Sequence, residues 1–262
     1  MGDPEPVQRE LLEIAREAAA AASSVLRDRF GQRAEGVRSK SGPTDLVSDA
    51  DVAAEAAIRR VLAERRPEDR VLGEEGGTSG DGRLQWVVDP LDGTINFLFG
   101  IPVFAISIAC EDERGAIVGL VLDPVRDECF EATRSKRATL GGQPIHCSER
   151  EDLATALVAT GFNYDAGVRA RQAEVVGRVL PRVRDIRRLG AAALDLCWTA
   201  CGRYDAFYER GVHAWDIAAG SLIASRAGLA VQELTAEREE PSGVIAAPEA
   251  LIDELLELVT GI

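Results

Sequence analysis

Several common kinds of site are missing from this sequence. It has only two histidines, His146 and His213, and five cysteines with no C-x-x-C pair among them. An odd number of cysteines without paired spacing argues against a disulfide framework and against a zinc knuckle. The G-x-S-x-G elbow of serine hydrolases and the lysine-bearing P-loop are absent as well. Chemistry on a phosphate would therefore depend on other groups.

Positive charge and long apolar runs are also scarce. The chain carries 30 Lys and Arg against 44 Asp and Glu, a formal net charge of -14, which predicts a surface that repels nucleic acid and anionic lipid. No basic segment followed by an apolar core opens the chain, and Gly100 and Pro102 interrupt the longest apolar run. We therefore expect a cytoplasmic protein that binds neither nucleic acid nor a membrane.

Hydrophobic periodicity predicts an α+β fold in two halves. In residues 1–142, helical spacing over 7–28 and 49–66 precedes short strand-like segments divided by turn residues, at 86–89, 103–109, 116–122 and 128–132. These segments predict two helices followed by an antiparallel sheet.

Residues 143–262 instead alternate between strand and helix patterns, which is typical of an α/β arrangement. The predicted strands are 157–160, 206–209 and segments near 186, 231 and 244, and the predicted helices are 166–180, 191–201, 216–227 and 248–260. The boundary near residue 142 carries no linker, so we expect two closely packed halves.

The segment Trp86 to Phe97, W-V-V-D-P-L-D-G-T-I-N-F, carries the strongest chemical signal. A hydrophobic strand runs into Asp89 and Asp92, with the Leu91 carbonyl between them, and this all-oxygen set is what Mg²⁺ prefers. The amides of Gly93 and Thr94 then begin a short helical turn, where an anion such as phosphate is favoured. Asp-Pro and Asp-Gly also form ordinary turns, so the segment alone does not decide its role.

Two further carboxylates stand beside apolar residues. Glu74 follows a short apolar run in G-E-E, and Asp216 opens a predicted helix in W-D-I-A-A-G. Carboxylates seldom occupy such places without a partner, although a turn residue or a helix cap would explain each one alone. Together with Asp89 and Asp92 they predict a site for more than one magnesium ion.

These three motifs, at residues 73–75, 86–97 and 215–220, resemble the inositol monophosphatase family in residues, order and separation. The resemblance extends over nearly the whole chain, and residues 183–188 resemble the actinobacterial members most. It implies a layered α-β-α-β-α sandwich, a homodimer, and Mg²⁺-dependent hydrolysis of myo-inositol 1-phosphate or a similar polyol phosphate.

The resemblance also assigns roles to single residues. The implied metal ligands are Glu74, Asp89, the Leu91 carbonyl, Asp92 and Asp216. The implied positioning groups for the attacking water are Asp51, Thr94 and Glu74, with Lys40 near the phosphate. The implied contacts with the substrate are Leu91, Asp92, Gly93, Thr94, Gly190, Ala191, Ala192, Glu209 and Asp216, with residues 162–164 facing the same pocket.

The resemblance thus implies that a metal-activated water attacks phosphorus in line, and neither histidine is needed. Histidinol phosphate, fructose 1,6-bisphosphate and nucleotide 3'-phosphates are rival substrates, because relatives on this fold use the same metal cluster. Glu209 favours a polyol because it matches the carboxylate that accepts hydroxyl hydrogen bonds. A regulatory protein is the alternative from another class, since some bacterial relatives act on the transcription machinery.

Overall fold

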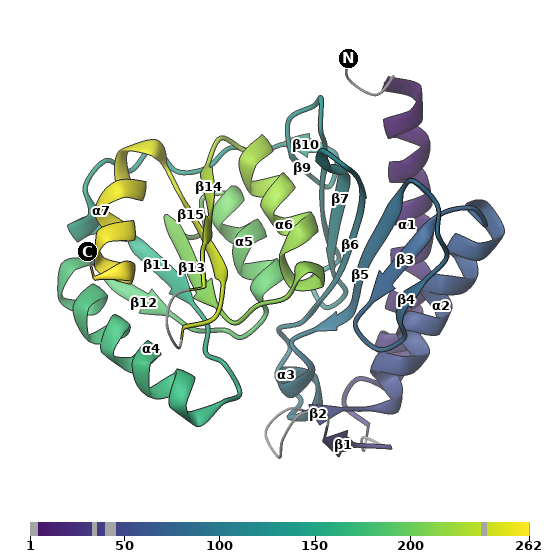
Figure 1. Cartoon of the computed structure of the whole chain (residues 1–262), viewed down its shortest axis with the longest axis horizontal. Helices are drawn as coiled ribbons and strands as arrows, with labels where there is room; N and C mark the ends of the chain where they lie inside the picture. Colours follow the sequence, from purple (N-terminus) through teal and green to yellow (C-terminus); the bar gives the residue numbers. More distant parts are fainter. Residues whose placement is uncertain (1–4, 33–35, 40–45, 237–239, 262) are drawn as a thin grey trace.

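The computed structural model describes residues 5–32, 36–39, 46–236 and 240–261. They form five layers in the order helix, sheet, helix, sheet, helix (Figure 1). This arrangement confirms the predicted sandwich. Lys40 lies outside the described residues.

The larger sheet has eight strands in the order β10-β9-β8-β7-β6-β5-β3-β4, and only β3 and β5 pair in parallel. Its strands are β3 (Arg70–Gly73), β4 (Gly77–Ser79), β5 (Gln85–Asp92), β6 (Ala105–Asp112), β7 (Gly115–Asp123), β8 (Glu128–Thr133), β9 (Thr139–Leu140) and β10 (Gln143–Pro144). The meander β5 to β8 confirms the predicted antiparallel strands. A separate two-stranded ribbon pairs β1 (Arg38–Ser39) with β2 (Leu46–Val47).

The smaller sheet has five strands in the order β12-β11-β13-β15-β14. They are β11 (Leu157–Thr160), β12 (Asp185–Arg187), β13 (Ala206–Arg210), β14 (Ala230–Leu234) and β15 (Gly243–Ala247). Strand β11 runs parallel to both of its neighbours, whereas the pairs formed by β15 are antiparallel. The predicted alternation is confirmed. The division into domains near residue 142 stays a prediction.

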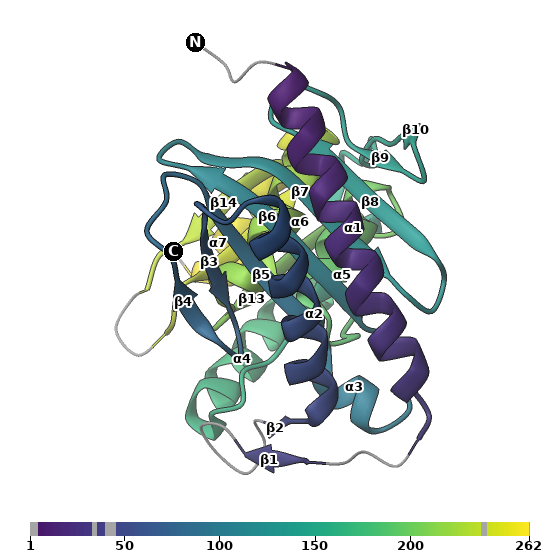
Figure 2. The same cartoon turned by 90° about the vertical axis from the view of Figure 1, so that its right-hand side faces the viewer.

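Helices fill the three remaining layers. They are α1 (Glu5–Arg29), α2 (Asp49–Arg65), α3 (Thr94–Leu98), α4 (Ala166–Val179), α5 (Ala192–Ala200), α6 (Ala214–Arg226) and α7 (Glu249–Thr260), with single 3₁₀ turns at Leu153–Thr155 and Leu180–Arg182. Helices α1 and α2 lie side by side on the outer face of the larger sheet (Figure 2). Helices α5 and α6 separate the two sheets, and α4 and α7 cover the smaller one (Figure 1).

The sequence of α1 explains how it attaches to the sheet. Leu11, Ile14, Ala15, Ala18 and Ala22 recur at helical spacing, and each is 0% exposed. Burying one such Leu or Ile contributes about 1.5–3 kcal/mol, so the stripe fixes α1 against β6 and β7. Within the described part of the chain, none of the helices is apolar for long enough to cross a bilayer.

The start of α2 fixes one predicted site residue. Ser48 is the N-cap, and its side chain accepts a hydrogen bond from the Ala50 amide at 3.2 Å. Asp51 reaches back to accept bonds from the Ser48 amide at 2.9 Å and hydroxyl at 2.7 Å. This reciprocal cap holds Asp51, which is 0% exposed, in one orientation.

Candidate active site

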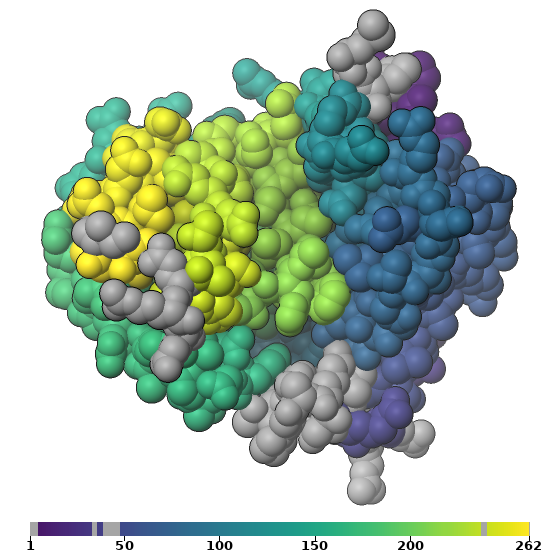
Figure 3. Space-filling view, in the orientation of Figure 1, coloured from purple at the N-terminus to yellow at the C-terminus, as the bar shows by residue number. Residues whose placement is uncertain are grey.

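A cavity of about 660 Å³ lies where the two halves meet. Its walls include ten of the predicted site residues, namely Glu74, Asp89, Leu91, Asp92, Gly93, Thr94, Gly190, Ala192, Glu209 and Asp216. Asp51 and Ala191 are both 0% exposed and lie behind the wall. In the space-filling view the two halves form one continuous body (Figure 3).

Strand pairing brings the first carboxylates together. Because β3 and β5 run parallel with Gly73 opposite Val88, the next residues, Glu74 and Asp89, lie at the same edge of the sheet. The Glu74 amide donates to the Val88 carbonyl at 3.2 Å. Pairing of β5 with β6 shifts register between Asp89 and Asp92, so both aspartates reach the cavity.

Backbone amides orient the two buried aspartates. Asp89, 1% exposed, accepts a bond from the Leu91 amide at 2.9 Å. Asp92, 8% exposed, accepts bonds from the amides of Ala192 at 3.1 Å and Ala193 at 2.8 Å, at the start of α5. The helix N-terminus therefore supports a carboxylate from the other half of the molecule.

The simpler explanation of Asp216 placed it at the N-cap of this helix. In the structure Asp216 lies at the third position of α6 instead. His213 is the N-cap, and its amide donates to the Asp216 carboxylate at 2.6 Å. The imidazole of His213 stacks on Trp215 with 4.8 Å between ring centroids. The Trp215 carbonyl accepts a bond from the Ser107 hydroxyl at 3.0 Å, which ties the start of α6 to β6.

These carboxylates are buried close to one another, so ionisation of each one is unfavourable. Burial, and then the negative charges of Glu74, Asp92 and Asp216, raise the pKa of Asp89 well above its usual range. Burial and the charge of Asp216 raise the pKa of Asp92 in the same way, against the bonds from the α5 amides. Like charges in a buried wall are unfavourable unless cations join them.

The side chains do not enclose an ion by themselves. Over the described residues, no three His, Cys, Asp or Glu side chains lie close enough together to hold a metal in this structure. Their chemistry nevertheless fits a hard divalent cation, because every donor is an oxygen and the carboxylates of one cavity raise one another's pKa.

Thr94 connects the cavity to Asp51. Its hydroxyl lies 2.8 Å from the Asp51 carboxylate and 3.0 Å from the Leu91 carbonyl, and its single proton serves one acceptor at a time. Thr94 opens α3 after Gly93, whose φ of +93° is a left-handed conformation that glycine adopts at little cost. The predicted short helical turn at this position is confirmed.

The opposite wall carries a mixture of charges. Burial and the charge of Asp216 raise the pKa of Glu209 to about 8, while Arg188 acts in the other direction. The Arg188 guanidinium lies 5.7 Å from the Phe162 ring. Phe162, Asn163 and Tyr164 all line the cavity, as the segment 162–164 was predicted to do.

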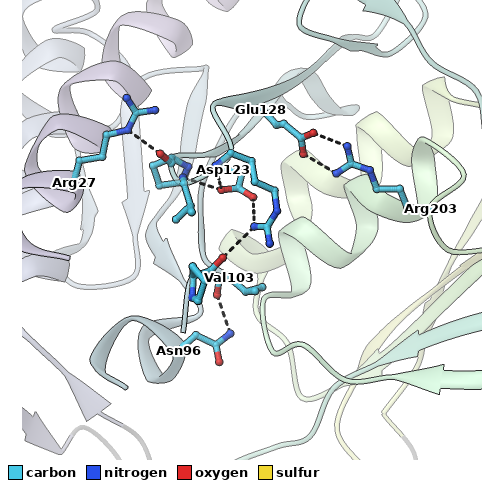
Figure 4. Close-up of polar contacts among 10 residues, drawn as sticks. Arg27, Asn96, Val103, Asp123, Glu128 and Arg203 are labelled. Atoms are coloured by element: carbon cyan, nitrogen blue, oxygen red, sulfur yellow. Dashed lines mark hydrogen bonds and ion pairs between the residues drawn. The ribbon is translucent and has the colours of Figure 1, made fainter. Parts of the chain in front are cut away.

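Sequence reasoning missed the residues that hold the walls in place. Glu55 accepts bonds from the amides of Glu75 at 2.7 Å and Gly76 at 2.8 Å, and thereby fixes the loop that carries Glu74. The side-chain amide of Asn96 donates to the Val103 carbonyl at 2.8 Å (Figure 4). The same group donates to the Leu189 carbonyl at 2.8 Å and so joins α3 to the C-terminal half. Neither role is visible in sequence, because each joins segments that are distant along the chain.

A family model described as the inositol monophosphatase family matches residues 7–261. The chain belongs to the inositol monophosphatase family. Among relatives of this inositol monophosphatase family protein, inositol-1-monophosphatase SuhB of Mycobacterium tuberculosis is 42% identical, over 97% of this chain and 94% of the relative. Nus factor SuhB of Haemophilus influenzae is 36% identical, over 94% of each chain. The crystal structure of extragenic suppressor protein suhB from Bartonella henselae superposes with a TM-score of 0.88 at 34% identity, over 96% of this chain and 99% of that one.

Proposed function

We propose that the protein is a Mg²⁺-dependent phosphatase that hydrolyses myo-inositol 1-phosphate or a similar polyol phosphate. One observation carries the proposal: a wall of buried carboxylates faces the same cavity as Glu209. The first group suits divalent cations and a phosphate, and the second suits an alcohol with several hydroxyls. The name of the Mycobacterium tuberculosis relative supports the same substrate.

Glu74, Asp89, Asp92, Asp216 and the Leu91 carbonyl would hold the cations. When bound, Mg²⁺ would supply Lewis acidity, lowering the pKa of a water and neutralising phosphate charge. The protein's part is to present oxygens at a fixed place, and the amide bonds to Asp89 and Asp92 do this.

Thr94 and Asp51 would orient the attacking water. When the Thr94 hydroxyl donates to Asp51, its oxygen lone pairs are left to accept a hydrogen bond from water in the cavity. Asp51 is already fixed by Ser48, so the hydroxyl has one preferred direction. Gly93 and Thr94 amides at the start of α3 would face the phosphate.

Glu209 would bind the alcohol. Its Oε2 atom is buried without a hydrogen-bond partner among the described residues, so a hydroxyl that donates to it satisfies an otherwise orphaned acceptor. Gly190 and Ala192 line the adjacent wall, and Arg188 adds donors on the same side. This combination favours a polyol over a simple apolar ester.

A steady-state panel tests this function. Inositol 1-phosphate, histidinol phosphate, fructose 1,6-bisphosphate and adenosine 3',5'-bisphosphate would each be assayed with Mg²⁺ and with chelator. We expect the highest kcat/KM with inositol 1-phosphate and loss of phosphate release on chelation. Asp92→Asn should abolish turnover while thermal unfolding stays cooperative, and a fully active Asp92→Asn variant would contradict the metal assignment.

A regulatory role is the second candidate, because a relative of comparable length bears the name Nus factor SuhB. We propose that any such role uses the outer surface, since the cavity is lined by the phosphatase residues. A chain that releases no phosphate from any ester of the panel with Mg²⁺ would favour this second function.

A further inference from the structure

The residue facing Glu209 across the smaller sheet is a glycine. Strands β11 and β13 pair in parallel with Thr160 opposite Tyr208, so Gly161 and Glu209 are the next positions of the two strands. A methyl group on Gly161 would place its carbon 2.1 Å from each of the three carboxyl atoms of Glu209, Cδ, Oε1 and Oε2. The Glu209 carboxyl group therefore occupies the place where a side chain at position 161 would lie.

The backbone does not explain this glycine. Gly190 and Gly211, which line the cavity, have φ values of +83° and +82°, and other residues rarely adopt that conformation. Gly161 is not among the residues with positive φ. An alanine would accept its backbone, so the observed reason for glycine is space.

The space beside Gly161 matters because the surroundings of the Glu209 carboxyl group leave few other positions for it. Glu209 Oε2 is already buried, and the negative charge of Asp216 is close enough to raise the pKa of Glu209. Arg188 has the opposite effect on that pKa, and its guanidinium lies 5.7 Å from the ring of Phe162, the residue after Gly161. The sequence Gly161-Phe162 thus borders both charged groups of the alcohol wall.

We propose that Gly161 is a positioning residue that seats the Glu209 carboxylate and thereby sets the preference of the enzyme for polyol phosphates over phosphate esters without hydroxyls. Gly161 acts through Glu209 and touches no reacting atom. The specificity part of this proposal rests on the proposed function, whereas the seat itself depends only on the geometry.

A double-mutant cycle tests the specificity. Gly161→Ala, Glu209→Ala and the double variant would be compared on inositol 1-phosphate and on 4-nitrophenyl phosphate, which offers no hydroxyl to Glu209. We expect Gly161→Ala to lower kcat/KM for inositol 1-phosphate about tenfold or more, mainly through KM, and to change 4-nitrophenyl phosphate hydrolysis less than about twofold. In the Glu209→Ala background, Gly161→Ala should cause no further change in the ratio of kcat/KM for inositol 1-phosphate to kcat/KM for 4-nitrophenyl phosphate.

Thermal unfolding of the same four proteins tests the seat without any activity. Gly161→Ala should lower Tm by about 3 °C or more in the wild-type background and by less than about 1 °C when Glu209 is already alanine. Gly177→Ala in α4 is the matched control, because a methyl group there meets nothing within 4 Å.

The outcomes separate this proposal from the proposed function. If Gly161→Ala lowers kcat/KM equally for both esters, or leaves the ratio of the two kcat/KM values unchanged, the specificity role is overturned. An equal loss of Tm in both backgrounds overturns the seat. If the wild-type chain hydrolyses neither ester, the proposed function fails, and the Tm cycle still decides whether Gly161 seats Glu209.

Discussion

Asp89 shows how single residues here exchange stability for function. It is 1% exposed and lies among other carboxylates whose charges raise its pKa. A buried charge surrounded by like charges destabilises a fold, and residues that do so persist where a ligand needs them. The metal-free protein should therefore gain stability when this charge is removed.

We predict that Asp89→Asn raises the Tm of the protein in chelator by about 2–4 °C, because asparagine removes the cost of burying an ionisable group among like charges while the bond from the Leu91 amide survives. The same variant should lose activity with Mg²⁺ by about a hundredfold or more. Differential scanning fluorimetry and phosphate release measure the two effects. Asp253→Asn on the exposed face of α7 is the control, and a lower Tm for Asp89→Asn would disprove the argument.

The raised pKa of Glu209 gives a pH dependence with a definite sign. Below its ordinary value of 4.5, folded and unfolded chains both carry the proton, so the group does not affect stability. Between about 4.5 and 8 the unfolded chain ionises while the folded chain keeps its proton, so stability falls as pH rises. Asp89, Asp92 and Asp195 shift in the same direction.

In chelator we expect Tm to fall by about 3 °C or more between pH 5 and pH 8. Glu209→Gln should flatten this slope, whereas Glu257→Gln, an exposed change on α7, should leave it unaltered. Asp112, whose pKa Arg134 lowers, loses its contribution only below about pH 4 and does not affect this window. A Tm that rises from pH 5 to pH 8 would refute a raised pKa of Glu209 in the folded protein.

At the scale of elements, α2 serves the site from behind. Its Glu55 accepts bonds from the Glu75 and Gly76 amides and from Arg59 Nε at 2.6 Å. The turn between β3 and β4, which carries Glu74, is thereby fixed to a helix of the outer layer. Groups that orient a metal ligand tune affinity for the metal without touching it.

We therefore predict that Glu55→Ala raises the Mg²⁺ concentration for half-maximal activity about 10- to 100-fold. The kcat at saturating Mg²⁺ should change much less. Titration of phosphate release against Mg²⁺ measures both quantities, with Glu64→Ala on the exposed side of α2 as the control. Unchanged Mg²⁺ dependence in Glu55→Ala would mean that the turn holds its shape without this carboxylate.

The elements differ in how far the sequence predicts them. Strand β11 and the helices α1, α2 and α4 follow strong periodic patterns and start or end within a few residues of their predicted bounds. Strands β3 and β4 were missed because Val71 and Leu72 make too short an apolar run and every residue of β4 is exposed. The parallel pairing of β3 with β5, which brings Glu74 beside Asp89, has no local signal at all.

The candidate site was predictable to a similar, limited extent. Asp89 and Asp92 stand in a motif with its own chemical logic, whereas the roles of Asp51 and Glu209 came only through resemblance. Ala191 lies behind the cavity wall, because its carbonyl is the first acceptor of α5 and its side chain is buried. Gly161 emerged only when β11 and β13 were placed side by side, and Arg188, which follows β12, emerged only through its contact with Phe162.

At the scale of the whole molecule, one apolar patch is open to solvent near α3. Phe99 is 74% exposed, Ile101 46% and Val125 42%. The bond from Arg126 Nη1 to the Pro102 carbonyl, 3.0 Å long, joins the two segments that carry them. Exposed apolar patches often mark contacts between proteins, and we propose that this patch belongs to the interface of the predicted homodimer.

If the chain forms the predicted homodimer through this patch, Phe99→Asp should shift the sedimentation coefficient from that of a dimer to that of a monomer at micromolar concentration, because a charge buried in an interface is unpaired. Leu180→Asp, which changes an equally apolar side chain that is 49% exposed, should leave the dimer intact. A dimer that persists in Phe99→Asp would place the interface elsewhere.

The cavity takes its walls from both sheets, and Asn96 and the α5 amides join them across the chain. The buried cluster that contains Trp86 draws only on residues of the N-terminal half, including α1 and α2, so Trp86 can be buried before that junction forms. During refolding from denaturant, the fluorescence of Trp86 should consequently recover ahead of phosphate release, because turnover has to await the docking of the two halves.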